Sequence, residues 1–350
     1  MAKLDYGRLL ESAGKGVADY LGTALADGSI NRQQHDSACE ETIPNLREWL
    51  SDPHIDVVSP RLKEGIAVAI EAEDWETLVN AFRRKMRFGT AGIRGVMGFD
   101  RESIERLKEE GIDAPILKGP NTLNNVVLLL TSAGVAKYGR TREPAFDRIV
   151  IGYDSRVRGG DFATCIAELF LAYGYTVHLF DQPCPYPVVT YAIPYEKIKA
   201  QLGVLISASH NDYRYNGFKL SCGNGSQFDP KDRDEMYNAF IAHATTADIK
   251  LCPLSEAPEG KLYFLGGREE AEGFDYVARE DCRINILDPH QNHIKQFLVR
   301  SDLSQTQAIS DDPLRIGYCA YHGAGRSIVP ALLREAGLAH VKPITRNGMN

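Results

Sequence analysis

Residues 202–219 read Leu202-Gly-Val-Leu-Ile-Ser-Ala-Ser-His-Asn-Asp-Tyr-Arg-Tyr-Asn-Gly-Phe-Lys219, an apolar run followed by a polar stretch. The apolar run, Leu202–Ile206, is typical of a buried strand. The residues after it place a hydroxyl, an imidazole and an amide in a loop. Asn216-Gly217 is the strongest short turn signal, so we expect a turn there and a returning strand that carries Lys219 back beside the loop.

Ser209 is the candidate reactive residue of this loop, because His210 follows it and Lys219 is expected to return beside it. A serine next to a base can act as an activated nucleophile. No Gly-x-Ser-x-Gly elbow surrounds Ser209, so the pattern of the α/β hydrolases is missing. A cationic lysine also suits a phosphoryl group better than an acyl group. An ordinary polar turn of an α/β domain is the alternative that this loop alone leaves open.

A second stretch, Arg87-Phe-Gly-Thr-Ala-Gly-Ile-Arg-Gly-Val-Met-Gly98, contains four glycines and an arginine at position 94. Glycines let backbone N–H groups approach an anion closely, and the planar guanidinium of Arg94 suits phosphate. The stretch is not a Walker loop, because no Gly-Lys-Ser/Thr follows, and it is not a dinucleotide fingerprint. By itself it fits a phosphate loop or a structural turn, and Arg94 fits a phosphate ligand or a surface salt bridge.

Together the two stretches resemble the α-D-phosphohexomutase superfamily, the phosphoglucomutases and phosphomannomutases. That family carries Thr/Ser-Ala-Ser-His-Asn-Pro with Asn-Gly-x-Lys behind it, and an earlier Phe-Gly-Thr-x-Gly-x-Arg-Gly. Further matches follow in the family's order: Ile149-Val-Ile-Gly-Tyr-Asp-Ser-Arg156, Pro185-Tyr-Pro187 and Ala320-Tyr-His-Gly-Ala-Gly325. Phe88–Gly92, Trp49-Leu50 and Gly223–Gln227 are similar to the phosphoglucomutase/phosphopentomutase branch.

The resemblance implies that Ser209, the serine before His-Asn, is the phosphoserine. The phosphoryl group would pass from it to a sugar phosphate, and a bisphosphate would return the other phosphate. Lys219 and Arg94 would supply the positive charge that a phosphoryl transition state requires, and His210 would assist by hydrogen bonding or proton handling. Asp212 stands where the family usually has proline, which puts the rigidity of the loop in question.

The resemblance assigns substrate or phosphate binding to Thr90, Asn211, Arg94 and Lys219. It implies Mg²⁺ as the cofactor of the complete enzyme, held by three aspartates of an Asp-x-Asp-x-Asp-Arg loop and by the serine phosphate. That loop does not occur in this sequence. The only metal contact expected from this chain is therefore Ser209, through its phosphate.

The sugar-selecting Gly-Glu-Glu-Ser/His loop and the C-terminal phosphate clamp of the family do not occur either. We therefore expect a fragment, inactive by itself, of a mutase. Such an isomerase and intramolecular phosphotransferase moves a phosphoryl group between the 1- and 6- (or 5-) positions of a hexose (or pentose) phosphate. The alternative is a catalytically inactive phosphosugar-binding or regulatory protein.

Two other motif residues keep more than one interpretation. Arg156 either caps the end of its strand or touches ligand, and the sequence leaves both open. His322 lies in a tight turn, which favours support of a domain interface over a catalytic role. His290 and His293 have the spacing of a metal pair, but without a third ligand at useful spacing we interpret them as a solvated surface pair.

Composition agrees with a small-molecule enzyme. A net charge of −7 over 350 residues gives no positive field for nucleic acid. No apolar run approaches the length that spans a membrane, so we expect sugar phosphates as partners, no nucleic acid, no membrane, and a cytoplasmic location. Seven cysteines without a C-x-x-C pair predict neither a disulfide framework nor a zinc ribbon.

Periodicity and breakers divide the chain into a helical extension (1–85), phosphohexomutase domain I (86–245), a polar, irregular linker or start of domain II (246–312) and an incomplete domain II (313–350). Strands are expected at 148–153, 175–180, 202–206, 218–222 and 315–320. Helices are expected at 102–110, 126–138, 161–173, 187–193, 232–243, 291–299 and 327–335. The alternation within domain I predicts a three-layer α/β/α sandwich with a mixed sheet.

Overall fold

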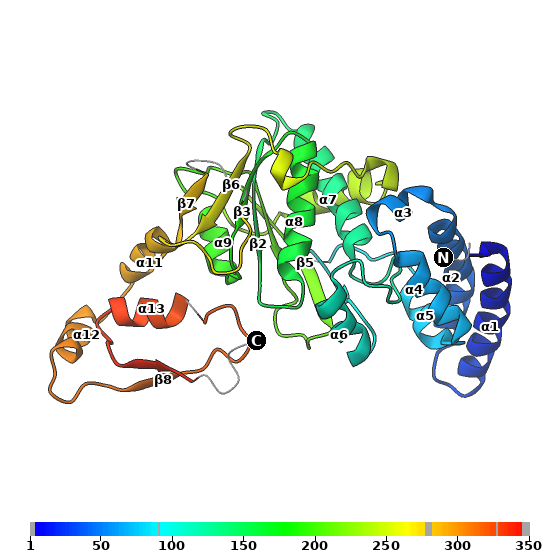
Figure 1. Cartoon of the computed structure of the whole chain (residues 1–350), viewed down its shortest axis with the longest axis horizontal. Helices are drawn as coiled ribbons and strands as arrows, with labels where there is room; N and C mark the ends of the chain where they lie inside the picture. Colours follow the sequence, from blue (N-terminus) through cyan, green and yellow to red (C-terminus); the bar gives the residue numbers. More distant parts are fainter. Residues whose placement is uncertain (1–3, 90–91, 277–281, 327, 345–350) are drawn as a thin grey trace.

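The computed structural model describes residues 4–89, 92–276, 282–326 and 328–344. A helical N-terminal part, a central sheet covered by helices and a small C-terminal part follow one another along the molecule (Figure 1). The predicted α/β sandwich with a helical N-terminal extension is confirmed. Within the described ranges, no helix has the length and apolar composition needed to cross a membrane.

The N-terminal part consists of α1 (Tyr6–Ala26), α2 (Arg32–Ser51), α3 (Pro53–Val58), α4 (Leu62–Glu71) and α5 (Trp75–Phe82). Asn31 and Gln34 form a capping box at the start of α2, and Asp74 caps α5 with its carboxylate. Trp49 and Phe82 meet edge to face with ring centroids 5.9 Å apart. Both rings belong to a buried cluster that continues into the sheet domain, so the helical extension and the sheet share one core.

The central sheet, as far as the described residues show it, has the strand order β1-β5-β4-β2-β3-β6-β7. The strands are β1 (Gly92–Val96), β2 (Arg148–Tyr153), β3 (Thr176–Phe180), β4 (Leu202–Ile206), β5 (Tyr215–Cys222), β6 (Leu262–Gly266) and β7 (Arg283–Asn285). β5 runs antiparallel to both of its neighbours, β1 and β4, and the other neighbours are parallel. The sheet is therefore mixed, as predicted.

Helices cover both faces of this sheet, with α8 (Gly159–Ala172) on one face and α9 (Tyr186–Ala192) on the other. The other helices of this part are α6 (Arg101–Glu110), α7 (Asn125–Arg140), which packs on α8, and α10 (Pro230–Met236), which continues as a π turn (Tyr237–Ile241). Alternation along β2 separates the layers: Ile149 and Ile151 join the core that includes α7 and α8, whereas Val150 packs in a second core with Val188 of α9. Parallel strands that are buried on both faces produce this α/β/α arrangement.

The dipeptide Asn216-Gly217 lies inside β5, so the prediction of a turn there is wrong. The chain turns earlier, in residues 207–214. Packing requires the glycine: a Cβ at this position would lie 2.6 Å from the carbonyl oxygen of Ser207 and 2.8 Å from that of Ile93. The glycine marks a close approach of neighbouring backbone segments, and β5 begins before the dipeptide rather than after it.

The segment 246–312 contributes β6 and β7, which extend the sheet beyond β3 in parallel. The prediction of an irregular segment is therefore wrong for residues 262–266 and 283–285. The sequence did not predict these two strands because each is short and lies among Pro, Gly and charged residues. Short 3-10 turns at Thr246–Asp248 and Leu254–Glu256 precede them. The division of the chain into domains stays a prediction.

The C-terminal part contains α11 (Leu287–Lys295), α12 (Ser301–Ala308), β8 (Ile316–Tyr318), α13 (Ile328–Glu335) and β9 (Val341–Pro343), with β8 and β9 paired in parallel. Lys295 donates to Glu335 at 2.8 Å and joins α11 to α13. His290 is buried against the ring of Tyr191 on α9, so the interpretation as a solvated pair is wrong for this histidine. Ile328 of α13 packs in the same core as α9, which attaches this part to the sheet domain.

Candidate functional site

The strand order indicates where a ligand would bind. The chain leaves β2 toward β3 on one side and leaves β4 toward β5 on the other side. Open α/β sheets bind ligands outside the carboxyl ends of strands where the order reverses in this way. The loops that follow β2 and β4 therefore position the candidate site, which is formed by residues 154–156 and residues 207–214. Residues 207–214 are called the serine loop below.

Ser209 lies in the serine loop with its side chain exposed. Its φ is +57°, in the left-handed region that non-glycine residues seldom adopt. The backbone N–H of Ser209 donates to Oγ of Ser207 at 3.1 Å, which supports this conformation from within the loop. Oγ of Ser209 lies 3.5 Å from Nδ1 of His210, whose ring is also exposed. The loop thus presents a hydroxyl and an imidazole to solvent together.

Arg94 reaches this loop from an edge strand far away in the sequence. β1 pairs antiparallel with β5, and Arg94 stands opposite Gly217. Its side chain is exposed, and Nη1 donates to Oδ1 of Asn211 at 2.9 Å. The structure therefore brings Arg94 and Asn211 into direct contact, although more than a hundred residues separate them in the chain.

Lys219 lies two residues along β5 from the position opposite Arg94, so the two cations are diagonal neighbours on one face. Nζ of Lys219 lies 5.2 Å from the centre of the Tyr186 ring. The hydroxyl of Tyr186 in turn forms a 2.9 Å hydrogen bond with Oγ of Ser221. Partial burial lowers the pKa of Lys219, and the positive charge of Arg94 lowers it further. The strand pairing thus concentrates positive charge beside the serine loop.

Asp154 follows the last residue of β2 and lies next to the serine loop. Burial raises the pKa of this carboxyl, while a hydrogen bond from the Ser207 side chain and the neighbouring positive charges of Arg156 and Lys219 oppose that rise. Oδ1 of Asp154 accepts the backbone N–H of Arg156 at 3.1 Å, and Oδ2 lies 3.4 Å from Nε of the same residue. Asp154 therefore links the strand end to both the serine loop and Arg156.

Asp212, the departure from the family's proline, forms an ion pair within the loop. Its Oδ2 accepts from Nη2 of Arg214 at 2.9 Å and its Oδ1 from Nε at 3.2 Å. Hydrogen bonds from Arg214 hold the pKa of Asp212 below its usual value. Nη1 of Arg214 also donates to the carbonyl oxygen of Phe99. The ion pair between Asp212 and Arg214 and the hydrogen bond from Arg214 to Phe99 therefore restrict the motion of the loop, as the proline ring of the family would do at this position.

Thr90 lies outside the described residues, so its assignment to phosphate binding stays a prediction. No group of three or more His, Cys, Asp or Glu side chains gathers within the described part of the chain to hold a metal ion. Asp154 and Asp212, the carboxylates at the serine loop, are each engaged by an arginine. Since Mg²⁺ needs several oxygen ligands in near-octahedral geometry, the described donors do not make its site, and the Mg²⁺ requirement stays a prediction.

The turn that contains His322 contacts the loop after β2. The hydroxyl of Ser155 donates to the carbonyl oxygen of His322. The contact uses the backbone of His322, and the imidazole is exposed. This geometry fits the support of an interface between the sheet domain and the C-terminal part.

Sequence reasoning missed three contributors to the site: Tyr186, Asp154 and Ser207. Asp154 and Tyr186 lie in quoted motifs, but no spacing in the sequence shows that Tyr186 would lie under Lys219. Ser207 is the first serine of the loop in the sequence, and its role follows only from the hydrogen bond that its Oγ accepts from the backbone N–H of Ser209. A search for polar residues at the ends of all predicted parallel strands would have found Asp154.

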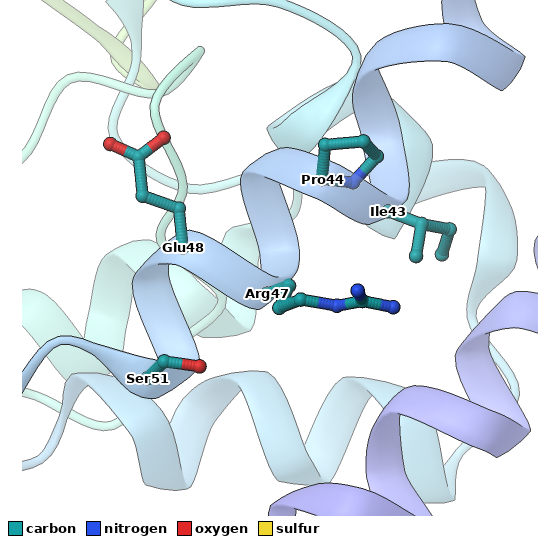
Figure 2. Close-up of a pocket in the computed structure, with 5 residues that line it drawn as sticks. All are labelled: Ile43, Pro44, Arg47, Glu48 and Ser51. Carbon is teal, nitrogen blue, oxygen red and sulfur yellow. The ribbon is translucent and has the colours of Figure 1, made fainter.

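A separate pocket of about 480 Å³ lies on α2 in the N-terminal part, away from the sheet edge (Figure 2). Ile43 and Arg47 extend to one side of the helix in this view, and Glu48 extends to another. Glu48 is paired with Lys85 at 2.8 Å. Pro44 and Ser51 complete the lining. The pocket therefore lies outside the serine loop and the loop after β2, which carry the candidate site.

Comparisons with known proteins agree with the geometry. The sequence model of the family "Phosphoglucomutase/phosphomannomutase, alpha/beta/alpha domain I" matches residues 85–246. The chain is 31% identical to a phosphoribomutase of Saccharomyces cerevisiae, over 54% of this chain and 28% of the relative. It is 31% identical to a phosphomannomutase of Mycoplasma pneumoniae, over 84% of this chain and 44% of the relative. It therefore spans less than half the length of these curated relatives.

The fold is also found among solved structures. One from Thermus thermophilus, described as a phosphomannomutase, covers 76% of this chain, and the chain covers 47% of it, with a TM-score of 0.50 and 21% identity. At that identity the likeness concerns the fold alone. Residues 85–246 therefore match domain I of the phosphoglucomutase/phosphomannomutase family, and the relatives support the placement of the chain in the α-D-phosphohexomutase superfamily.

Proposed function

We propose that this chain carries the phosphoryl-storing part of a phosphosugar mutase of the phosphoglucomutase/phosphopentomutase type. Its substrates would be hexose or pentose phosphates, with the phosphoryl group moving between positions 1 and 6, or 1 and 5. The relatives of the chain are named as gluco-, manno-, ribo- and pentomutases, which supports this class. The observation that carries the proposal is the contact of Arg94 with the serine loop, because nothing local in the sequence requires it.

In the proposed reaction Ser209 holds a phosphoryl group. A free hydroxyl of the sugar phosphate attacks the phosphorus atom and loses its proton to a base, while the bond from phosphorus to Oγ of Ser209 breaks and Oγ takes up a proton. The bisphosphate then reorients. Oγ of Ser209 loses that proton and attacks the other phosphorus atom, and the sugar oxygen that is released takes up a proton. His210 is the proposed proton acceptor in that second step, since its Nδ1 lies 3.5 Å from Oγ.

The positive charges have a direct purpose in this proposal. Phosphoryl transfer spreads negative charge over the transferred oxygens, so fixed cations nearby stabilise the transition state. Arg94 and Lys219 supply these charges from adjacent strands. Asn211, held by Arg94, and Thr90 are the proposed additional phosphate contacts. Mg²⁺ would supply further charge compensation in the complete enzyme.

The proposal is tested by incubating the purified chain with glucose 1,6-bisphosphate and measuring its intact mass. We expect the mass of one added phosphoryl group, and peptide mapping places it on Ser209. Ser209→Ala abolishes the label, and Ser226→Ala, which changes an exposed serine in the turn after β5, leaves it unchanged. A label on Ser207, or one retained in Ser209→Ala, would refute the assignment. Binding without any label would favour the catalytically inactive phosphosugar-binding alternative.

A further inference from the structure

Arg156 contacts the backbone of the serine loop at several points, which neither a strand cap nor a ligand contact requires. Nη1 donates to the carbonyl oxygens of Asp212 at 2.7 Å and Tyr215 at 2.8 Å. Nη2 donates to those of Ser209 at 2.9 Å and Asn211 at 2.6 Å. One guanidinium therefore binds four backbone carbonyls that extend from the reactive serine to the start of β5.

The guanidinium is itself fixed from behind. Its side chain is only 12% exposed, and Nε lies 3.4 Å from Oδ2 of Asp154. Asp154 also accepts the backbone N–H of Arg156, so the residue is tied to the end of β2 at two points. Arginine has five N–H groups in a planar fork. The Nη atoms donate to backbone carbonyls of the serine loop and of Tyr215, and Nε lies beside the Asp154 carboxylate as an ion pair without a hydrogen bond. These contacts favour neither of the earlier interpretations, a strand cap or a ligand contact.

The carbonyl of Ser209 has particular importance among these acceptors. Ser209 has a φ of +57°, which costs free energy for a residue with a Cβ and persists only where the surroundings enforce it. Binding the carbonyl oxygens of Ser209 and Asn211 fixes the peptide planes that follow each residue. Charge-assisted hydrogen bonds to one rigid group are well suited to hold such a turn.

We propose that Arg156 is a positioning residue for phosphoryl transfer: it holds the serine loop in the left-handed turn that presents Oγ of Ser209. The role in transfer rests on the function proposed above, whereas the hold on the loop does not. Arg156 acts through the backbone and leaves contact with the phosphoryl group to Arg94 and Lys219. Lysine cannot replace it, because a single ammonium has three donors and no planar fork.

The test uses the full 350-residue chain with Arg156→Ala and Arg156→Lys. Arg158→Lys is the matched control: Arg158 lies in the same loop and binds the carbonyls of Leu107 and Lys108 instead of the serine loop. Two quantities are measured in each variant. One is the amide hydrogen exchange of residues 207–217, and the other is the rate at which glucose 1,6-bisphosphate labels Ser209.

We expect the hydrogen-exchange rate of the loop amides to rise on the order of tenfold or more in both Arg156 variants. The rate of labelling at saturating bisphosphate should fall by a similar factor. The bisphosphate concentration that gives half of the maximal rate should change little. Adding methylguanidinium should restore labelling in Arg156→Ala and leave Arg156→Lys slow. Arg158→Lys should match the wild type in both measurements.

Wild-type loop exchange in the folded Arg156 variants would overturn the proposal, and so would unchanged labelling. If Arg156→Ala does not fold, Arg156→Lys decides by the same measurements. If the wild-type chain takes no label at all, the proposed function fails, while the exchange measurement still decides whether Arg156 holds the loop.

Discussion

Replacing Gly217 by alanine tests the close packing beneath the serine loop. The added Cβ would lie 2.6 Å from the carbonyl oxygen of Ser207 and 2.8 Å from that of Ile93, both backbone atoms of neighbouring segments. Real Cβ atoms do not approach so closely, and neither neighbour can move without breaking strand pairs. Overpacking of this kind costs about 1–3 kcal/mol, and two backbone clashes place Gly217→Ala at about 3 kcal/mol.

Gly14→Ala is the matched control, since a Cβ on Gly14 in α1 would meet no atom within 4 Å. Alanine is favoured over glycine inside a helix by about 0.5–1 kcal/mol, so this variant should be more stable than the wild type. Urea unfolding followed by circular dichroism measures both. An unfolding free energy of Gly217→Ala within about 0.5 kcal/mol of the wild type would refute the packing argument. The variant should also label Ser209 slowly, because Ser207 donates its backbone N–H to Gly217.

Three other expectations follow from the site and the core. Arg94→Gln should slow labelling of Ser209 by about 10²-fold, as loss of one transition-state donor does, and an unchanged rate in a stopped-flow quench would contradict its role. The isolated chain should show little or no conversion of glucose 1-phosphate to glucose 6-phosphate in a coupled assay; robust turnover would count against the fragment interpretation. Burial lowers the pKa of His178 to about 4 from 6.5, so the imidazole takes up a proton more readily in the unfolded chain than in the folded one. The free energy of unfolding should therefore be highest above pH 6.5 and fall by about 3 kcal/mol toward pH 4. His178→Phe should flatten that dependence in urea titrations between about pH 4 and 7, and an equally steep curve would show that another group causes it.

The strands and helices with strong patterns could be predicted from the sequence. Residues 148–153 and 202–206 are strands as predicted, because apolar runs in a parallel sheet are buried on both faces. Asn216-Gly217 led to a wrong prediction of a turn, because the same dipeptide occurs in tight turns and in strands that lie close to another backbone segment. Only the neighbouring backbone determines which of the two forms. β7 was not predicted because three residues give too little periodicity to interpret. β6 is as long as β4, but it lies among Pro, Gly and charged residues that are typical of a linker.

The candidate site divides in the same way. Ser209, His210 and Asn211 are adjacent in the sequence, so their common loop follows from the strand that precedes them. The contact of Arg94 with Asn211 depends on the pairing of β1 with β5, which no local pattern specifies. The four carbonyls bound by Arg156 could not be predicted at all, because a backbone oxygen carries no residue identity.

The position of β1 at the sheet edge has a consequence for folding kinetics. β2 pairs with β3, and β4 pairs with β5, across short stretches of chain, whereas Gly92 of β1 pairs with Lys219, more than a hundred residues later. Contacts of high contact order close large loops and form late. During synthesis the ribosome releases β1 long before β5 exists, so Arg94 remains on an unpaired, solvated strand while the parallel core assembles. The cationic half of the site is therefore added to a nearly finished domain, and substitutions in β1 should accelerate unfolding more than they slow folding.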